Sequence, residues 1–143
     1  MTDLDQVAEQ WAALQVLNRA ARAIDQATPT DWLDCYADDG VFRYRAVGGT
    51  EDVFRLAGHA ELTSWFAEHR KRMPAGTQAH LLLNPALVPD GDRIRATCTY
   101  LTLSTATGQL APMSCGLWED VLVKGADGNW RIADRCAYRL MPA

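Results

Sequence analysis

Apolar residues recur at three- and four-residue steps from Leu4 to Asp25. This spacing is typical of one face of an α-helix. The face comprises Val7, Trp11, Leu14, Leu17, Ala21 and Ile24. Asp25 falls near the middle of the same stripe, where an ionised carboxylate costs several kcal/mol unless it is paired or hydrogen-bonded. We therefore expect another part of the fold to supply a partner for Asp25.

The sequence pattern predicts two more helices after the first. Thr30 is a suitable N-cap for a short helix over Asp31–Tyr36. A second long helix is predicted from His59 to Arg72. Its apolar side comprises Leu62, Trp65, Phe66 and His69. His59 and His69 are expected at the surface or edge of this helix.

Residues that alternate between apolar and polar predict the strands. The first strand, Val41–Ala46, follows the turn residues Asp38-Asp39-Gly40. The remaining four are expected over His80–Val88, Arg93–Ser104, Met113–Val123 and Trp130–Leu140. Helices followed by a run of strands predict an α+β fold, with N-terminal helices packed on one face of a mostly antiparallel sheet. When strongly curved, such a sheet leaves a conical pocket beneath the helices.

Composition narrows the class of protein. The chain has 143 residues, of which 48% are hydrophobic and 22% charged, which suits one globular domain over residues 1–143. A net charge of -4 argues against nucleic acid as a partner. We expect no membrane partner, because no apolar run approaches spanning length, and a polar, acidic N-terminus favours a cytoplasmic location.

The cysteines and histidines give no sign of a metal or cofactor. Cys35, Cys98, Cys115 and Cys136 are isolated along the chain and are expected to be reduced. No group of His, Cys, Asp and Glu has the spacing of metal ligands, and no glycine-rich phosphate loop occurs. We expect no bound metal and no cofactor.

Several segments, taken together and in order, carry a resemblance to a known family. They are Ala23-Ile24-Asp25, Leu33 to Phe42 with Asp39, Gly58 to Phe66, Thr77 to Leu81 with Asn84-Pro85, Gly116 to Asp120, and Gly128 to Ile132 with Arg135. The chain resembles the SnoaL-like branch of the nuclear transport factor 2-like superfamily over almost its whole length. The resemblance implies a cone-shaped α+β barrel and a homo-oligomer, either a dimer or a trimer.

The resemblance also implies a catalytic pair. In scytalone dehydratase, hexachlorocyclohexane dehydrochlorinase and bile acid dehydratase, an Asp on the first helix pairs with a His on a strand. Asp25 and His80 look like the matches to these two residues, and Tyr44 resembles a strand tyrosine that contacts substrate or water. This chain departs from the pattern at Ile24 and Trp118, where relatives have tyrosine, and no histidine follows His80.

Each candidate residue has a structural alternative. His80 would act as a general base that Asp25 orients and balances in charge. Alternatively, Asp25 caps a loop and backbone atoms satisfy His80. Tyr44 could donate to a substrate oxygen and Trp118 could form a flat pocket wall, but both also suit core packing.

Three polar residues extend the list of candidates. Asn84 follows His80 by four strand positions, so a regular strand would put both on one face, where Asn84 could bind substrate. Before Pro85, however, it could simply shape the end of a strand. Asp120 and Arg135 lie on neighbouring strands and are expected to form a structural ion pair; Arg135 could instead steady a leaving group or oxyanion.

The favoured interpretation is a cofactor-independent lyase or isomerase that acts on a small hydrophobic cyclic substrate, such as a polyketide- or steroid-like molecule. Dehydration or another elimination is the first expectation, followed by cyclisation or double-bond isomerisation. Two non-enzymatic alternatives stay open. One is a structural subunit similar to the small β-subunits of ring-hydroxylating dioxygenases, and the other is a ligand-binding or assembly domain.

Overall fold

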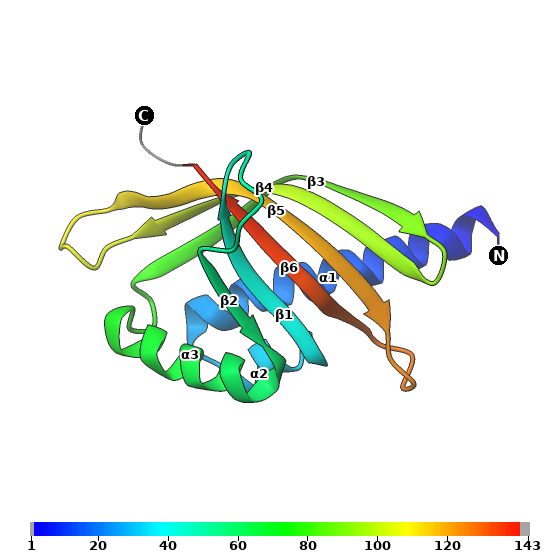
Figure 1. The fold of residues 1–143 in the computed structure, drawn as a ribbon, viewed down its shortest axis with the longest axis horizontal. Coiled ribbons are helices and arrows are strands. Elements are labelled where there is room, and N and C mark those ends of the chain that lie inside the picture. Colours follow the sequence, from blue (N-terminus) through cyan, green and yellow to red (C-terminus); the bar gives the residue numbers. More distant parts are fainter. Residues whose placement is uncertain (1, 141–143) are drawn as a thin grey trace.

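Three helices lie on one face of a curved six-stranded sheet in the computed structural model, which describes residues 2–140 (Figure 1). The elements are α1 (Asp3–Gln26), α2 (Pro29–Leu33), β1 (Tyr36–Ala46), β2 (Phe54–Ala57), α3 (Gly58–Arg72), β3 (Gln78–Asp90), β4 (Arg93–Ser104), β5 (Ala111–Lys124) and β6 (Trp130–Arg139). The predicted α+β architecture is therefore confirmed. Within the described range, none of the helices is long and apolar enough to cross a membrane.

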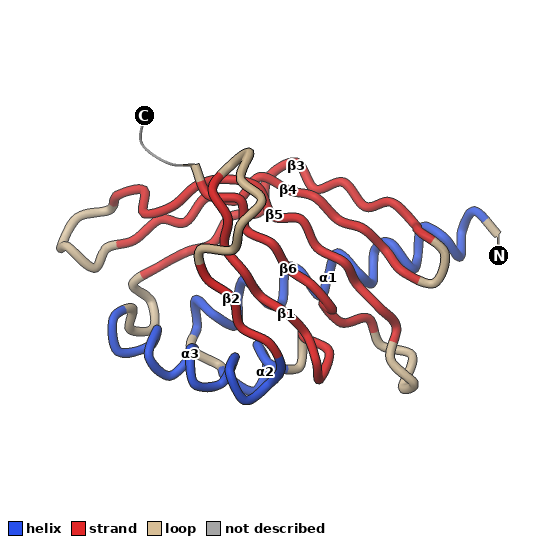
Figure 2. The backbone as a smooth tube through the Cα atoms, viewed as in Figure 1, coloured by secondary structure: helices blue, strands red, loops and turns tan. Residues whose placement is uncertain are grey.

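The strands are ordered β2-β1-β6-β5-β4-β3 across the sheet. Of these neighbours, β1 and β6 run parallel and the others are antiparallel, so β3 to β6 form an antiparallel meander (Figure 2). The strand β2 is an addition to the predicted set. It pairs with β1 from Val41↔Ala57 to Tyr44↔Phe54, and its four residues are too few to give a clear alternation in sequence.

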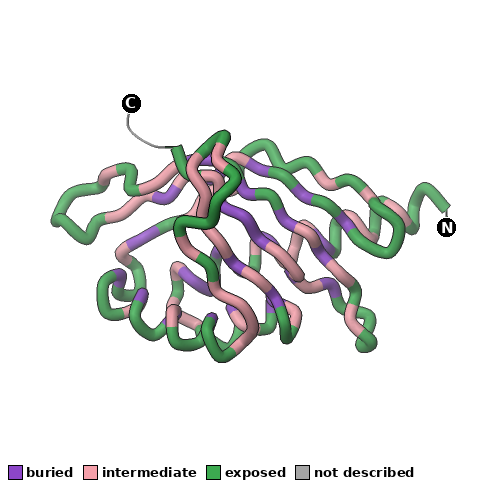
Figure 3. The backbone as a smooth tube through the Cα atoms, in the orientation of Figure 1, coloured by how far each residue is buried: buried purple, intermediate pink, exposed green. Residues whose placement is uncertain are grey.

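The buried residues lie between the helices and the inner face of the sheet (Figure 3). In α1 the buried residues include Ala13, Leu17, Ala20 and Ile24. Val7 and Trp11, predicted to be buried, are 61% and 63% exposed. The buried stripe is thus displaced toward the alanines, whose small side chains let α1 approach the sheet closely. In Figure 1 the N-terminal part of α1 extends past the edge of the strands.

Two kinds of irregularity bend the sheet. Register shifts occur in β3 between Leu83 and Ala86, and in the pairing of β5 with β6 between Val121 and Leu122. Such bulges curve a strand and increase its twist. In addition, a Cβ at Gly116 would collide with the carbonyl oxygen of Tyr138, so only glycine allows this approach of β5 to β6.

The cysteines contribute to the core as small apolar side chains. Cys35, Cys98 and Cys136 are buried, Cys115 is half-buried, and all four are free. The expectation of reduced cysteines is confirmed.

Candidate active site

A cavity of about 620 Å³ lies between the inner face of the sheet and the helices. Aromatic side chains from helices and strands form much of its wall, among them Phe42, Tyr44, Phe54, Trp65 and Trp118. This size and lining suit a small, largely apolar molecule, because such ligands bind in mostly apolar clefts with a few polar groups.

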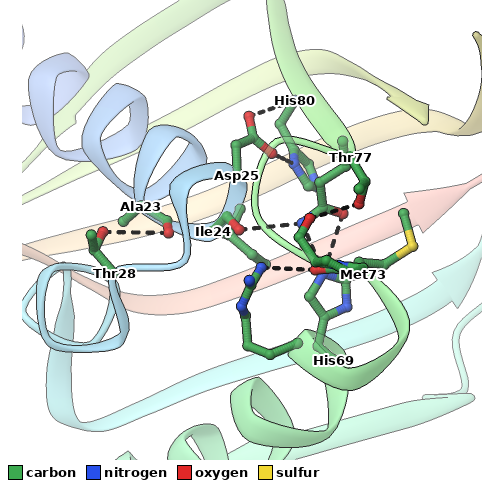
Figure 4. A network of polar contacts seen from close by, with 11 residues as sticks. Ala23, Ile24, Asp25, Thr28, His69, Met73, Thr77 and His80 are labelled. Atoms are coloured by element: carbon green, nitrogen blue, oxygen red, sulfur yellow. Dashed lines mark hydrogen bonds and ion pairs between the residues drawn. The ribbon is translucent and has the colours of Figure 1, made fainter. Parts of the chain in front are cut away.

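The end of α1 determines the position of Asp25. Ala27 adopts a left-handed conformation with φ 65°, and its amide donates to the carbonyl oxygen of Ala23. Thr28 donates its backbone amide to the same oxygen at 3.0 Å, and its hydroxyl lies 3.4 Å from that oxygen (Figure 4). This closure is a common helix C-terminus, and it leaves Asp25 in the last turn, directed toward β3.

Asp25 and His80 are joined by two hydrogen bonds. The ring Nδ1 of His80 lies 2.6 Å from Asp25 Oδ1, and the backbone amide of His80 donates to Asp25 Oδ2 at 2.8 Å. The side chains are largely shielded from solvent, with 12% of His80 and 19% of Asp25 exposed. The partner that the apolar position of Asp25 requires is thus His80.

This contact determines the protonation of the second ring nitrogen of His80, Nε2. A carboxylate at Nδ1 holds the proton of the neutral ring on that nitrogen, so that Nε2 carries a free lone pair. His80 lines the cavity, and Nε2 has no hydrogen-bond partner among residues 2–140. Trp118 stacks nearby at a centroid distance of 6.0 Å and an angle of 26°. The arrangement suits proton transfer at Nε2.

Tyr44 lies on β1 within the same cavity wall. Its ring packs against Phe42 and Phe54 at centroid distances of 5.0 and 5.5 Å. Burial raises the pKa of Tyr44 to about 12, so the phenol stays protonated and can donate a hydrogen bond. Its hydroxyl contacts no hydrogen-bond partner in the described part of the chain. Tyr44 therefore combines packing with a free donor.

Trp118 lies over a buried ion pair. Arg135 donates from Nε to Asp120 Oδ1 at 2.7 Å and from Nη2 to Oδ2 at 3.1 Å, and the side chains are 3% and 0% exposed. Burial tends to lower the pKa of Arg135, but the Asp120 carboxylate outweighs it and raises the pKa. The guanidinium carbon lies 4.0 Å from the centroid of the Trp118 ring. Arg135 thus supports Trp118 from below while it lines the cavity.

Asn84 requires a correction. It lies in the register shift of β3 with φ 52°, is exposed, and does not line the cavity. The prediction that it shares the face of His80 assumed a regular strand, and the bulge at Asn84-Pro85 breaks the alternation. Asn84 therefore shapes the strand and cannot contact a molecule inside the cavity.

Sequence reasoning missed His69. Only 9% of this residue is exposed, although it was expected at the helix edge. Its ring stacks on Trp65 at 4.8 Å and lines the cavity. His59, in contrast, lies outside the cavity, with Nε2 3.1 Å from the carbonyl oxygen of Tyr36. The available signal was the position of His69 on the apolar stripe of α3.

The charged groups of the cavity are mainly cationic. Besides Arg135, it is lined by Arg45, Arg72 and Arg139, and none of its lining residues is Asp or Glu. Arg45 pairs with Asp52 at 2.6 Å, whereas Arg72 and Arg139 have no ion-pair partner among residues 2–140. In the same range, no group of three or more His, Cys, Asp or Glu side chains could hold a metal ion.

Comparison with protein families gives one match. A family model described as SnoaL-like domain matches residues 5–136. No curated protein matches the chain at a significant level.

Solved structures with the same fold come from several bacteria. A protein of unknown function, Rv3472 from Mycobacterium tuberculosis, is 21% identical with a TM-score of 0.85, over 100% of this chain and 79% of that one. A candidate scytalone dehydratase from Novosphingobium aromaticivorans is 17% identical with a TM-score of 0.80, over 99% and 89% of the two chains. The beta subunit of a candidate aromatic-ring-hydroxylating dioxygenase from the same organism is 19% identical with a TM-score of 0.80, over 99% and 94%.

Proposed function

The chain belongs to the SnoaL-like domain family, and from this premise we propose that it is a cofactor-independent lyase. The proposed reaction is the dehydration of a small hydrophobic cyclic molecule, with cyclisation or double-bond isomerisation as related outcomes of the same base. The proposal treats residues 1–143 as one catalytic domain.

One observation carries this proposal. The Asp25 carboxylate bonds the ring Nδ1 and the backbone amide of His80, and the ring faces an aromatic cavity with a free Nε2. A histidine that only packs in a core has no need of a free nitrogen toward a cavity. A general base, in contrast, needs this geometry together with a carboxylate that stabilises the imidazolium formed.

In the proposed elimination, His80 both takes up the proton and returns it, so no other acid or base is required. Nε2 removes a proton from a carbon next to the substrate carbonyl, and the electron pair of the broken C–H bond moves toward that carbonyl. As the new C=C bond forms, the C–O bond of the leaving hydroxyl breaks. The hydroxide takes the proton from Nε2, so water leaves and His80 returns to its neutral form. Asp25 stays ionised throughout and balances the transient positive charge.

Tyr44 and Trp118 have supporting roles in this proposal. The protonated hydroxyl of Tyr44 donates to the carbonyl or leaving oxygen and thereby polarises it. Trp118 forms a flat wall beside His80, at an angle of 26° to its ring. Arg135 is engaged with Asp120 through two nitrogens, so we assign it to holding Trp118 rather than to binding substrate.

The free cations Arg72 and Arg139 refine the substrate class. Both line the cavity and are exposed to solvent, which identifies this side as the mouth. Cations in a partly enclosed cleft attract anions and raise their local concentration. We propose that the cyclic substrate carries an acidic substituent directed toward this mouth, which strengthens binding and takes no part in the elimination itself.

The test uses 3-hydroxy-1-tetralone, a bicyclic β-hydroxy ketone whose dehydration yields 1-naphthol. Naphthol formation is followed by fluorescence for the wild-type protein and for His80→Gln, with His59→Gln as a matched histidine control outside the cavity. General base catalysis contributes about 10²- to 10⁴-fold, so the His80 variant should lose at least about 10²-fold in rate. Equal rates in wild type and His80→Gln would refute the proposal.

A second candidate is a non-catalytic subunit of a larger assembly. The outer face of the sheet favours it, because Leu83 and Leu117 are 40% and 44% exposed there. Gel filtration of the isolated chain distinguishes the enzyme from the non-catalytic subunit. A stable homodimer or homotrimer supports the enzyme, whereas a chain that aggregates until a larger partner is added supports the subunit.

A further inference from the structure

His69 is a second buried polar group that faces the cavity, and the proposed elimination does not use it. It comes from α3, beside the start of the strand that carries His80, and its ring stacks on Trp65 at an angle of 19°. Its Nε2 lies within hydrogen-bond distance of the Gln78 side chain. Its Nδ1 has no partner among residues 2–140. The ring is therefore held on one side and open to the cavity on the other.

Gln78 determines which nitrogen of His69 carries the proton. The Gln78 amide nitrogen lies 3.2 Å from the carbonyl oxygen of Ile24, which can only accept, so this atom must be the donor. The same nitrogen lies 2.9 Å from His69 Nε2, closer than the amide oxygen at 3.2 Å. Its second hydrogen thus points at Nε2, which must accept. The proton of the neutral ring then resides on Nδ1.

The surroundings keep His69 neutral. Burial lowers the pKa of His69, and the positive charges of Arg72 and Arg70 lower it further. A neutral ring with Nδ1 protonated is a hydrogen-bond donor of fixed direction.

We propose that the Nδ1–H of His69 is the second hydrogen-bond donor of the cavity and holds an oxygen of the bound molecule on its helix side, with Tyr44 as the donor on the sheet side. The inference rests on the proposed function only in that a cyclic molecule with oxygen occupies the cavity. It assigns no proton transfer to His69. Negative charge that develops on the held oxygen is stabilised by a donor already in place, which requires no rearrangement during the reaction.

The first test reads the tautomer directly. The chain has three histidines, so long-range ¹H–¹⁵N correlation spectra of wild type, His59→Gln and His80→Gln assign every ring nitrogen. We expect His69 to be neutral with its proton on Nδ1. A proton on Nε2, or a charged ring at neutral pH, would overturn the inference.

The second test uses 1-tetralone, whose carbonyl can only accept, and tetralin, which has the same two rings without oxygen. Both are titrated into His80→Gln protein, in which the proposed base is absent. We expect 1-tetralone, but not tetralin, to shift the Nδ1–H resonance of His69 downfield. Replacing His69 by Phe, which keeps a ring beside Trp65, should weaken 1-tetralone binding about threefold to tenfold and leave tetralin binding unchanged.

The outcomes separate this inference from the proposed function. An unshifted Nδ1–H resonance at saturating 1-tetralone, or equal loss of affinity for both probes in His69→Phe, contradicts the donor role. If His69 binds 1-tetralone but wild-type protein does not dehydrate 3-hydroxy-1-tetralone, the donor role stands and the elimination is refuted.

Discussion

Asp25 contacts His80 through both of its carboxylate oxygens, one on the ring Nδ1 and the other on the backbone amide. The first bond fixes the tautomer of the ring, and the second ties the start of β3 to the last turn of α1. A single side chain therefore sets both the protonation and the position of His80. Ala27, two residues after Asp25 and held in a left-handed conformation, ends the helix directly after the turn that carries Asp25.

Asp25→Asn tests the fixed tautomer. An amide at this position can donate to Nδ1, which would move the ring proton to Nε2 and remove the lone pair from the cavity. We expect the rate of 3-hydroxy-1-tetralone dehydration to fall by about 10²- to 10⁴-fold, while circular dichroism reports an intact fold. Asp90→Asn, which alters an exposed carboxylate bonded to Arg95, is the matched control. A rate for Asp25→Asn close to that of the control would argue against the pair.

The pKa of Tyr44 predicts how stability depends on alkaline pH. Burial raises it to about 12 from an ordinary value of 10. Between these values the unfolded chain has lost the proton that folded Tyr44 retains, so the unfolded state binds fewer protons and stability falls as pH rises. The full stability is present below pH 10, and about 2 kcal/mol is lost by pH 12.

Urea unfolding at pH 9 and pH 11 measures this loss. Between the two, wild type should lose about 1 kcal/mol more than Tyr44→Phe, which has no titrating phenol. An identical decrease in both proteins would mean that Tyr44 titrates normally.

Much of the architecture could be predicted because it follows local rules. Turn residues such as Asp90-Gly91-Asp92 separate strands whose alternation is regular, and the α3 stripe from Leu62 to Phe66 is helical in period. The need of Asp25 for a partner was also evident from its place among apolar residues. That the partner is His80 came from the resemblance, because no periodicity relates residues 55 positions apart.

The errors arose where tertiary context decides. Asn84 was placed by assuming strict alternation, which a bulge interrupts. His69 looked like an edge residue because the basic run that follows it suggests solvent, yet the ring turns inward against Trp65. Trp11 was assigned to the core from periodicity, but its neighbour Gln10 contacts β3 instead, and Trp11 is 63% exposed. In each case the position of the side chain depends on neighbouring parts of the fold as well as on the residue type.

The buried ion pair Asp120–Arg135 predicts a large loss of stability when one of its partners is removed. Both side chains are almost fully buried and directly opposite in register. Asp120→Ala would leave an uncompensated guanidinium, which typically costs about 3–5 kcal/mol. Glu68→Ala breaks the pair with Lys71, in which both side chains are at least 65% exposed, and should cost less than about 1 kcal/mol. Urea unfolding at pH 7 compares the two variants, and similar losses would contradict the assignment.

The outer face of the sheet predicts the assembly of the protein. Leu83, Thr99, Leu117 and Tyr138 lie opposite one another in register and form a row across β3 to β6. Leu81, Leu101 and Cys115 form a second row beside it. No helix covers this side in Figure 1, and contiguous exposed apolar side chains of this kind mark interaction sites. We expect a second copy of the chain to cover these rows.

Leu117→Lys introduces a charge at the centre of this face. If two or more copies meet there, burying the ammonium without a partner is unfavourable, and gel filtration with light scattering should show the monomer mass. Leu110→Lys is the matched control, because Leu110 is 70% exposed between β4 and β5 and outside both rows. A homo-oligomer that persists in Leu117→Lys and dissociates in Leu110→Lys would move the interface to the β4–β5 hairpin.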